Sequence, residues 1–474
     1  MTRGVRRILA VMGVLSIGLA VAAAWFLAQA MPIGTGYVAK YLCTSTFLSK
    51  RDPQAVFVED IKPVNPLAEL VAWDIDRVGQ SVTATAFKVF RSKAIFRQGC
   101  GCTLLAGTTE ASLREQTFFR AGAGALPPST APDLPWPEGS GGAVDPASLG
   151  VDSKQLMQAL DDAFAEPGTD TLRQTRAVAV VYEGRLIAER YTRGFGPDMP
   201  LLGWSMSKSV TNALVGVLVR QGRLALKDPA PVAEWQSPDD PRRKITLDQL
   251  MRMSSGLAFE EVYKPLTDAT DMLYGSDDFA AFAAGRPLAV EPDEKWHYSS
   301  GTANIIARIV RHEAEKEVVD YYRFINESLF NRLGMASAII EPDPSGTFVG
   351  SSYTVATVRD WARFGLLYLQ DGVWGGRRIL PEGGVEYTTT PTPMAPKGEY
   401  GALFWLNAGA PGNPGDRLWP HAPLDAYAAQ GFQEQKVIVI PSKKLVLVRF
   451  GATAPRSAWD TDTFIAEVIR SLPR

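Results

Sequence analysis

The sequence predicts an α+β protein that follows an apolar amino-terminal helix, and three observations lead to this prediction. Helical patterns and strand patterns occupy separate blocks of the chain, which argues against a repeating βαβ sheet. An uncharged run of about 24 residues stands close to the amino terminus. The chain has 474 residues, and because a single core usually stops growing at roughly 250 to 300 residues, we expect one large domain and a smaller part.

The apolar run covers residues 8–31 and follows three arginines within the first seven residues. As a helix it is roughly 36 Å long, which is enough to span a bilayer. Because arginines stay on the cytoplasmic side, we expect a single-pass inner-membrane protein whose remainder lies in the periplasm or outside the cell. Two alternatives stay open. The first is a cleaved signal peptide, because the sequence AQA at 28–30 also fits a cleavage site. The second is a buried helix of a soluble protein, which would need a core on every side of the helix.

The small region after the helix contains alternating stretches such as SVTATAFKVF at 81–90, which predict half-buried strands. A stretch rich in Pro, Gly and Ser then interrupts the hydrophobic pattern and predicts a linker. The expected organisation is an anchor or signal segment at 1–31, a small region at 32–121, a linker at 122–146 and a large domain at 147–474.

The three cysteines favour one disulfide in an oxidising compartment. We expect Cys43 to pair with either Cys100 or Cys102, leaving one thiol over. Three unpaired buried cysteines are the alternative.

The large domain begins with a predicted helix at 153–166, followed by two apolar strands that flank Glu183-Gly184 as a hairpin. Two more strands are expected around the Pro-Ser-Lys-Lys turn within 434–451, and a final helix at 459–472 closes the chain. Further helical patterns lie between these blocks, at 204–222, 246–256, 300–317 and 357–372.

Composition excludes two classes of function. The net charge is −2, so the chain has no basic excess to hold a polyphosphate, and nucleic acid is not an expected partner. The three histidines and three cysteines show no zinc-ligand spacing, so no metal and no cofactor are expected.

The stretch GWSMSKSV, at 203–210, places Ser205 and Lys208 three residues apart at the start of a helical pattern. Residues i and i+3 share a helix face, so with Ser205 in the first turn the lysine amine can reach the hydroxyl. A serine becomes a nucleophile when a base takes its proton, and a lysine serves as that base when burial lowers its pKa. An isolated SxxK is also common by chance, with the serine as an ordinary N-cap and the lysine in solvent.

Two further stretches strengthen the hydrolase interpretation. WHYSSG at 296–301 sets Tyr298 before another helical pattern, and a phenol near an amine can relay protons. AAQGFQEQ at 428–435 directly precedes the two carboxyl-terminal strands, where an edge strand can face the nucleophile.

In this order the three motifs resemble the serine β-lactamase and penicillin-recognising superfamily. The tyrosine in the middle motif points to the class C β-lactamase and esterase branch, and ITLDQLMRMSSGL and SSYTVATVRDWARFGLLYLQDGVWGGRRILP are most similar to the aminohexanoate-oligomer (nylon-oligomer) hydrolases. The resemblance covers 151–474. It implies a β-lactamase/transpeptidase-like fold, with an antiparallel sheet flanked by helices and a helical subdomain.

The resemblance also implies a role for each matching residue. Ser205 is the acylated nucleophile, Lys208 its base, and Tyr298 the group that exchanges protons with the leaving group and the deacylating water. The backbone N–H groups of Ser205 and Phe432 form the oxyanion hole. Tyr263 stands where nylon-oligomer hydrolases keep a substrate-side tyrosine, although it fits a core aromatic as well.

Two departures from the family pattern concern substrate binding. Ala429-Gln430-Gly431 replaces K-T-G, so the cation that receives a β-lactam carboxylate is missing. Ser300 replaces the asparagine of Y-x-N and offers fewer hydrogen bonds to an acylamino side chain. We therefore expect a small ester or linear amide as substrate and poor hydrolysis of β-lactams.

Other interpretations remain to be weighed. A Ser-His-Asp hydrolase is one of them, but this chain lacks the G-x-S-x-G sequence around Ser205. His297 either lines the cleft or only packs against its neighbours. Trp204, Trp296 and Trp405 either form an apolar substrate wall or belong to the core. A non-hydrolysing, penicillin-binding-like membrane protein that docks peptidoglycan fragments is the alternative function.

Overall fold

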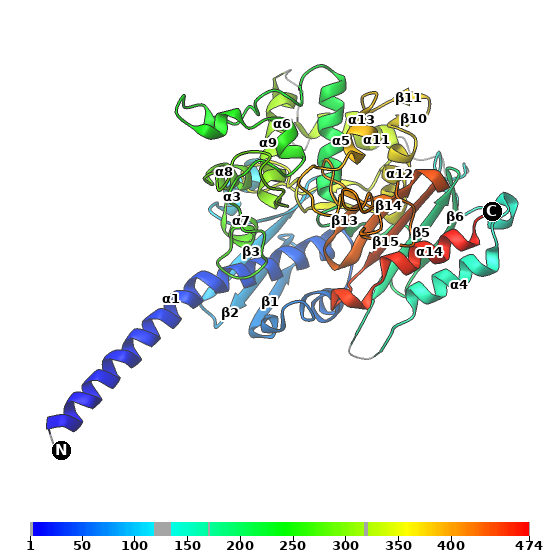
Figure 1. Ribbon diagram of the computed structural model, residues 1–474. Coiled ribbons are helices and arrows are strands. Elements are labelled where there is room, and N and C mark those ends of the chain that lie inside the picture. Colours follow the sequence, from blue (N-terminus) through cyan, green and yellow to red (C-terminus); the bar gives the residue numbers. More distant parts are fainter. Residues whose placement is uncertain (1–2, 118–133, 169–170, 317–320, 474) are drawn as a thin grey trace.

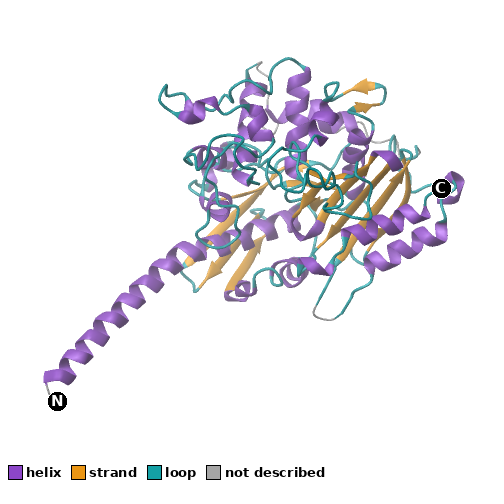
Figure 2. Ribbon diagram, viewed as in Figure 1, coloured by secondary structure: helices purple, strands orange, loops and turns teal. Residues whose placement is uncertain are grey.

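The computed structural model describes residues 3–117, 134–168, 171–316 and 321–473 (Figure 1). The part of the predicted linker at 122–133 lies outside these described residues. The architecture is α+β, as predicted: antiparallel sheets are flanked by helices, and a long helix projects from the body (Figure 2).

That projecting helix is α1, Arg3–Phe47. Its side chains are exposed from Val11 to Gln29, apart from a partly buried Leu27, and become buried from Ala30 onward. By length and composition, α1 is the one helix in the described chain that is apolar enough to cross a membrane. The helix does not end where the apolar run ends. It continues through Pro32 into the body, so one helix is both a candidate span and part of the folded core.

A small four-stranded antiparallel sheet packs on the buried half of α1. Thr35 of α1 hydrogen-bonds Ser92 of the sheet at 2.8 Å, and Phe47 stacks on Phe96. The predicted disulfide is confirmed: Cys43 of α1 bonds Cys102, and Cys100 keeps a buried thiol. The strands run in the order β1 (Val71–Asp76), β2 (Ser81–Ala86), β3 (Phe90–Arg97) and β4 (Gly101–Leu104), with short helices α2 (Pro53–Val56), η1 (Phe57–Ile61), η2 (Pro66–Leu70) and α3 (Glu110–Glu115) around them.

Buried polar contacts tie α1 to the rest of the body. Lys40 and Thr44 both bond the carboxylate of Glu341, which is fully buried. The ring of Tyr41 stacks on Trp204 at 5.7 Å between ring centres. Because an unpaired buried charge is costly, the Lys40–Glu341 pair favours a single seating of α1.

The central sheet is antiparallel, with strand order β12-β13-β14-β15-β5-β6. Alternation along β5 explains why both faces are covered: Val178 and Val180 lie in the core under α4 and α14, while Ala177 and Ala179 face the core on the α12 side. Figure 1 shows α4 and α14 side by side across the sheet. The bounds are β5 (Thr175–Tyr182), β6 (Arg185–Tyr191), β12 (Trp405–Leu406), β13 (Tyr427–Gly431), β14 (Gln435–Ile440), β15 (Leu445–Gly451), α4 (Ser153–Phe164), α12 (Val358–Leu369) and α14 (Thr461–Ser471).

A helical part covers the remaining side of the body. Its centre is α5 (Ser207–Arg220), most of whose side chains are buried. The other elements are α6 (Leu247–Met251), α7 (Asp268–Gly275), α8 (Phe279–Ala284), α9 (Ser300–Glu315), α10 (Tyr321–Ile325), η6 (Asn326–Phe330), α11 (Asn331–Leu333) and α13 (Gly384–Thr389), with short strands β7 (Leu201–Leu202), β8 (Ile339–Ile340), β9 (Thr354–Ala356), β10 (Val373–Trp374) and β11 (Arg377–Arg378).

Candidate active site

The candidate nucleophile lies in a tight turn that precedes α5. We expected Ser205 inside the first helical turn, but α5 begins two residues later, at Ser207. The i, i+3 relation survives, because the backbone N–H of Lys208 donates to the carbonyl of Ser205 at 3.1 Å. Trp204 has a positive φ of 49°, which is uncommon for a bulky residue and holds the turn in shape. Gly203 admits no side chain, since an added Cβ would lie 2.6 Å from Trp361.

Lys208 is buried directly beneath Ser205. Its Nζ lies 3.1 Å from each of three oxygens: Oγ of Ser205, Oγ of Ser300 and the backbone carbonyl of Ser351. Burial lowers the pKa of Lys208 to about 8, against the opposing negative charge of Glu261. An amine with this pKa is partly neutral near neutral pH and can accept a proton.

Glu261 is the polar residue of the site that the sequence analysis missed. Its carboxylate accepts the backbone N–H and the hydroxyl of Ser300, both at 2.6 Å, and the hydroxyl of Tyr263 at 2.9 Å. It stands in a loop that belongs to no motif. One signal in the sequence could have indicated it: Glu261 is a carboxylate two residues before the candidate substrate residue Tyr263, and no helical or strand pattern accounts for it.

These contacts give the hydrogen bonds around Lys208 one direction. The hydroxyl of Ser300 donates to Glu261, so it accepts from Lys208. The carbonyl of Ser351 only accepts. A neutral amine has two N–H groups, and both are then used. Its lone pair is left facing Ser205, which is the arrangement that general-base catalysis requires.

Tyr298 covers Lys208 from the other side. The amine of Lys208 lies 4.6 Å from the centre of the phenol ring, and the hydroxyl of Ser205 is close enough to the phenol to act on its pKa. Burial raises the pKa of Tyr298 well above its usual value. The phenol is therefore neutral at working pH, which makes it a proton donor rather than a phenolate base. Tyr400 and Trp405 pack against its ring at 5.8 and 5.5 Å.

The predicted oxyanion strand is β13, which ends beside the nucleophile turn. We expected an edge strand, and this holds for part of its length: β12 pairs with the outer side of Tyr427 and Ala428, and its register does not extend to residues 429–431. An added Cβ on Gly431 would lie 2.1 Å from the carbonyl oxygen of Gly203, so the two backbones touch. Phe432 meets the ring of Trp204 edge-on at 5.7 Å.

The remaining predicted substrate residues separate into two groups. Tyr263 lies in the site, with its hydroxyl 3.2 Å from Ser300 and its ring exposed. Ala429 is fully buried, and the side-chain oxygen of Gln430 accepts from Lys436 of the next strand at 2.8 Å. Ala429 and Gln430 therefore have only the backbone of β13 to offer to a substrate.

The predicted tryptophan wall is formed in part. Trp405 and Trp296 pack together near Tyr298 and are partly buried. Trp204 belongs to the core, held between Tyr41 and Phe432. His297 bonds the carbonyl of Phe259 at 2.7 Å, which ties two loops together.

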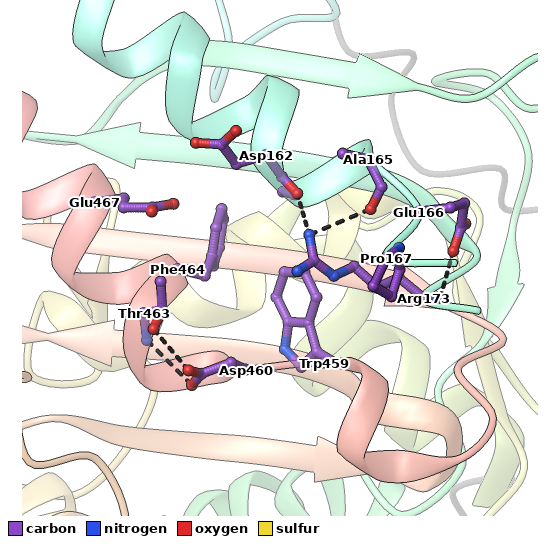
Figure 3. A pocket seen from close by; sticks show the side chains of 11 residues that line it. Asp162, Ala165, Glu166, Pro167, Arg173, Trp459, Asp460, Thr463, Phe464 and Glu467 are labelled. Atoms are coloured by element: carbon purple, nitrogen blue, oxygen red, sulfur yellow. Dashed lines mark hydrogen bonds between the residues drawn. The ribbon is translucent and has the colours of Figure 1, made fainter. Parts of the chain in front are cut away.

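A cavity between α4 and α14 lies on the opposite face of the sheet (Figure 3). Its polar groups already have partners: Arg173 donates to the carbonyls of Asp162 and Ala165, Glu166 accepts from the backbone of Arg173, and Asp460 caps α14. It brings together no nucleophile and base. Within the described ranges, no cluster of His, Cys, Asp or Glu suits a metal ion.

The comparison with known proteins agrees with the geometry of the site. A family model described as Beta-lactamase matches residues 160–468. The 6-aminohexanoate-dimer hydrolase of Paenarthrobacter ureafaciens is 26% identical over an alignment of 283 residues, with a coverage of 52% of this chain and 69% of that protein.

Solved structures resemble the same part of the molecule. A family VIII carboxylesterase has a TM-score of 0.53 at 14% identity, covering 70% of this chain and 99% of the other. A penicillin-binding protein homologue from Caulobacter crescentus has a TM-score of 0.51 at 16% identity, covering 70% and 99%. At these identities the two structures establish the fold alone.

Proposed function

The chain belongs to the β-lactamase family and is a serine hydrolase, and from this premise we propose that it hydrolyses uncharged esters or linear amides through an acyl-enzyme on Ser205 while tethered to a membrane. The observation that carries the proposal is the contact of 3.1 Å between Nζ of Lys208 and Oγ of Ser205. It joins a half-exposed hydroxyl to a buried amine whose pKa is about 8.

Acylation follows from this pair. Lys208 takes the proton of Ser205 as its oxygen attacks the substrate carbonyl. Negative charge then develops on the carbonyl oxygen, and the backbone N–H groups of Ser205 and Phe432 are the proposed donors that stabilise it. Tyr298 gives its proton to the leaving group and is restored from Lys208. Water attacks the ester of Ser205 by the reverse route, and the acid is released.

The surroundings of the site favour uncharged substrates. Tyr298, Tyr400 and Trp405 supply an aromatic wall, and Phe432 is exposed at the rim. Lys436, on the strand beside Gln430, is buried and pairs with Glu434 at 2.9 Å, so its charge is already compensated. A charge-assisted hydrogen bond is worth roughly 1.5 to 3 kcal/mol, so without a free cation β-lactams lose about ten- to a hundredfold.

Tethering rests on α1. The exposed apolar half of the helix is long enough to cross a bilayer, and the arginines before it favour a cytoplasmic amino terminus. The rival signal-peptide site at 28–30 lies within unbroken helix, and Ala30 is already buried in the body. Both features support an uncleaved anchor, with the hydrolase on the periplasmic or outer side.

The experiment compares three substrates on one preparation of full-length protein in detergent: a p-nitrophenyl ester, a linear aminohexanoate-type amide with both ends blocked so that it carries no charge, and nitrocefin. We expect ester and amide turnover to exceed nitrocefin turnover, and Ser205→Ala to abolish turnover and fluorophosphonate labelling. Ser148→Ala, at an exposed serine far along the chain, is the matched control.

Three outcomes contradict parts of the proposal. Labelling that persists in Ser205→Ala removes Ser205 as the nucleophile. Nitrocefin hydrolysed ten times better than the ester indicates a β-lactamase. A single burst of p-nitrophenol without turnover favours the non-hydrolysing binding protein.

A further inference from the structure

Contacts near both ends of β3 fix the orientation of the small sheet relative to α1. Near the start of β3, Ser92 bonds Thr35 and the carbonyl of Pro32. Near the end of β3, Phe96 stacks on Phe47. Strand and helix therefore run in the same direction, and the turn before β3 points toward the exposed half of α1. Figure 1 shows β1, β2 and β3 beside α1 where it leaves the body.

That turn, between β2 and β3, carries exposed apolar side chains. Phe87 is 54% exposed and Val89 is 75% exposed. The register pairs Val71 with Ala86, so the end of η2 lies at the same edge of the sheet. Leu67 and Leu70 of η2 are exposed there as well. We call these four residues the apolar tip.

The apolar tip reaches the level of the apolar helix. Val89 stands three residues before Ser92, which is about 10 Å along a strand at 3.3 Å per residue. On α1 the same distance corresponds to about seven residues before the level of Pro32, at 1.5 Å per residue. This level falls at Trp25 and Phe26, which are both exposed, and tryptophan is enriched where a helix leaves the hydrocarbon.

We propose that the apolar tip inserts into the same membrane surface as α1, as a second contact that holds the hydrolase body in one orientation. The proposal rests on the proposed anchoring by α1. If α1 is the only contact with the membrane, the body can rotate about the axis of that helix. A second contact beside the helix prevents this rotation. Lys88 and Arg91 are exposed at the tip, where their charges fit lipid phosphates.

The test places an environment-sensitive NBD fluorophore on single introduced cysteines of the full-length protein. The protein is held one copy per nanodisc of phosphatidylcholine and phosphatidylglycerol at about three to one. Val89→Cys reports on the tip, and Leu15→Cys reports on the exposed half of α1. Val78→Cys is the matched control, because Val78 is 98% exposed at the opposite turn of the same sheet. The buried thiol of Cys100 takes no label in the unsubstituted protein.

We expect doxyl-labelled lipids to quench the fluorophore at positions 89 and 15, with at least a twofold stronger effect at 89 than at 78. Quenching at 15 with none at 89 overturns the tip contact and leaves the anchor standing. A blue shift at 89 without lipid quenching also overturns it, in favour of contact with protein. No quenching at 15 removes the anchor and the tip contact together.

Discussion

At the residue scale, burial gives Lys208 the lowered pKa that its proposed role as a base requires. Its ammonium form is disfavoured by desolvation, and this lowers its pKa to about 8. Glu261 acts in the opposite sense, because its negative charge favours the ammonium. The carboxylate therefore raises the basicity of Lys208 while the hydrogen bond through Ser300 directs the lone pair toward Ser205.

The pH dependence of ester hydrolysis follows from this balance. Below about pH 8 Lys208 is protonated and cannot accept the serine proton, so kcat/KM should rise with pH and level off above the pKa. In Glu261→Gln the charge that raises the pKa is absent, so the rising limb should move to lower pH. Stopped-flow acylation over pH 5 to 10 measures both profiles.

Lys154→Ala, at an exposed lysine on α4, is the control and should leave the profile in place. A limb in Glu261→Gln that stays fixed or moves to higher pH contradicts the role given to the carboxylate.

Tyr298→Phe should separate amide from ester cleavage. An amine leaving group needs a proton from the phenol, whereas a p-nitrophenolate leaves without one, so amide turnover should fall by roughly 10² to 10⁴ and ester turnover by much less. The measurement is the ratio of kcat for the amide to kcat for the ester, compared between Tyr298→Phe and the unsubstituted protein. Equal losses on both would assign Tyr298 to positioning of Ser205.

At the scale of elements, the sequence pattern correctly predicted those helices and turns that neighbouring residues determine. The hairpin at Glu183-Gly184 is such a case, since both residues take positive φ and join two antiparallel strands. The predicted helices at 153–166, 357–372 and 459–472 are confirmed for the same reason, because each has a capping side chain and an apolar face. The order of the three motifs predicted that Ser205, Lys208 and Tyr298 lie together, and Lys208 contacts both of the others.

What the sequence could not predict depends on contacts between distant segments. Glu261 gains its importance from Ser300, 39 residues away, through bonds that no spacing rule describes. The outer pairing of β13 comes from β12, a strand of two residues. The extension of α1 past residue 31 depends on the aromatic and charged partners that its second half finds in the body.

Gly431 gives a test of the contact between β13 and the nucleophile turn. In Gly431→Ala the new Cβ would lie 2.1 Å from the carbonyl oxygen of Gly203, so β13 must move away. If Phe432 supplies an oxyanion donor, kcat should fall by about 10² to 10³. Gly142→Ala, at a glycine with open space around it, is the control. Circular dichroism should remain native; full activity in Gly431→Ala would exclude this oxyanion hole.

At the scale of the whole molecule, the proposed anchor and the hydrolase share one helix, α1. If α1 is an uncleaved anchor, we expect the protein to stay with membranes through alkaline carbonate washing and to be digested by protease only from the periplasmic face. Cell fractionation with a carboxyl-terminal epitope measures this. A soluble mature protein that begins at Met31 would establish signal-peptide cleavage instead.

The shared helix also sets a time order for folding. Lys40 is made early, and its partner Glu341 follows 301 residues later. At about 5 to 20 residues per second, the interval is roughly 15 to 60 s. Throughout it Lys40 lacks the carboxylate of Glu341, whereas Trp204, the ring that stacks on Tyr41, is made earlier in the same interval. The seating of α1 in the body is consequently completed late in synthesis, because the partner of Lys40 lies in the last third of the sequence.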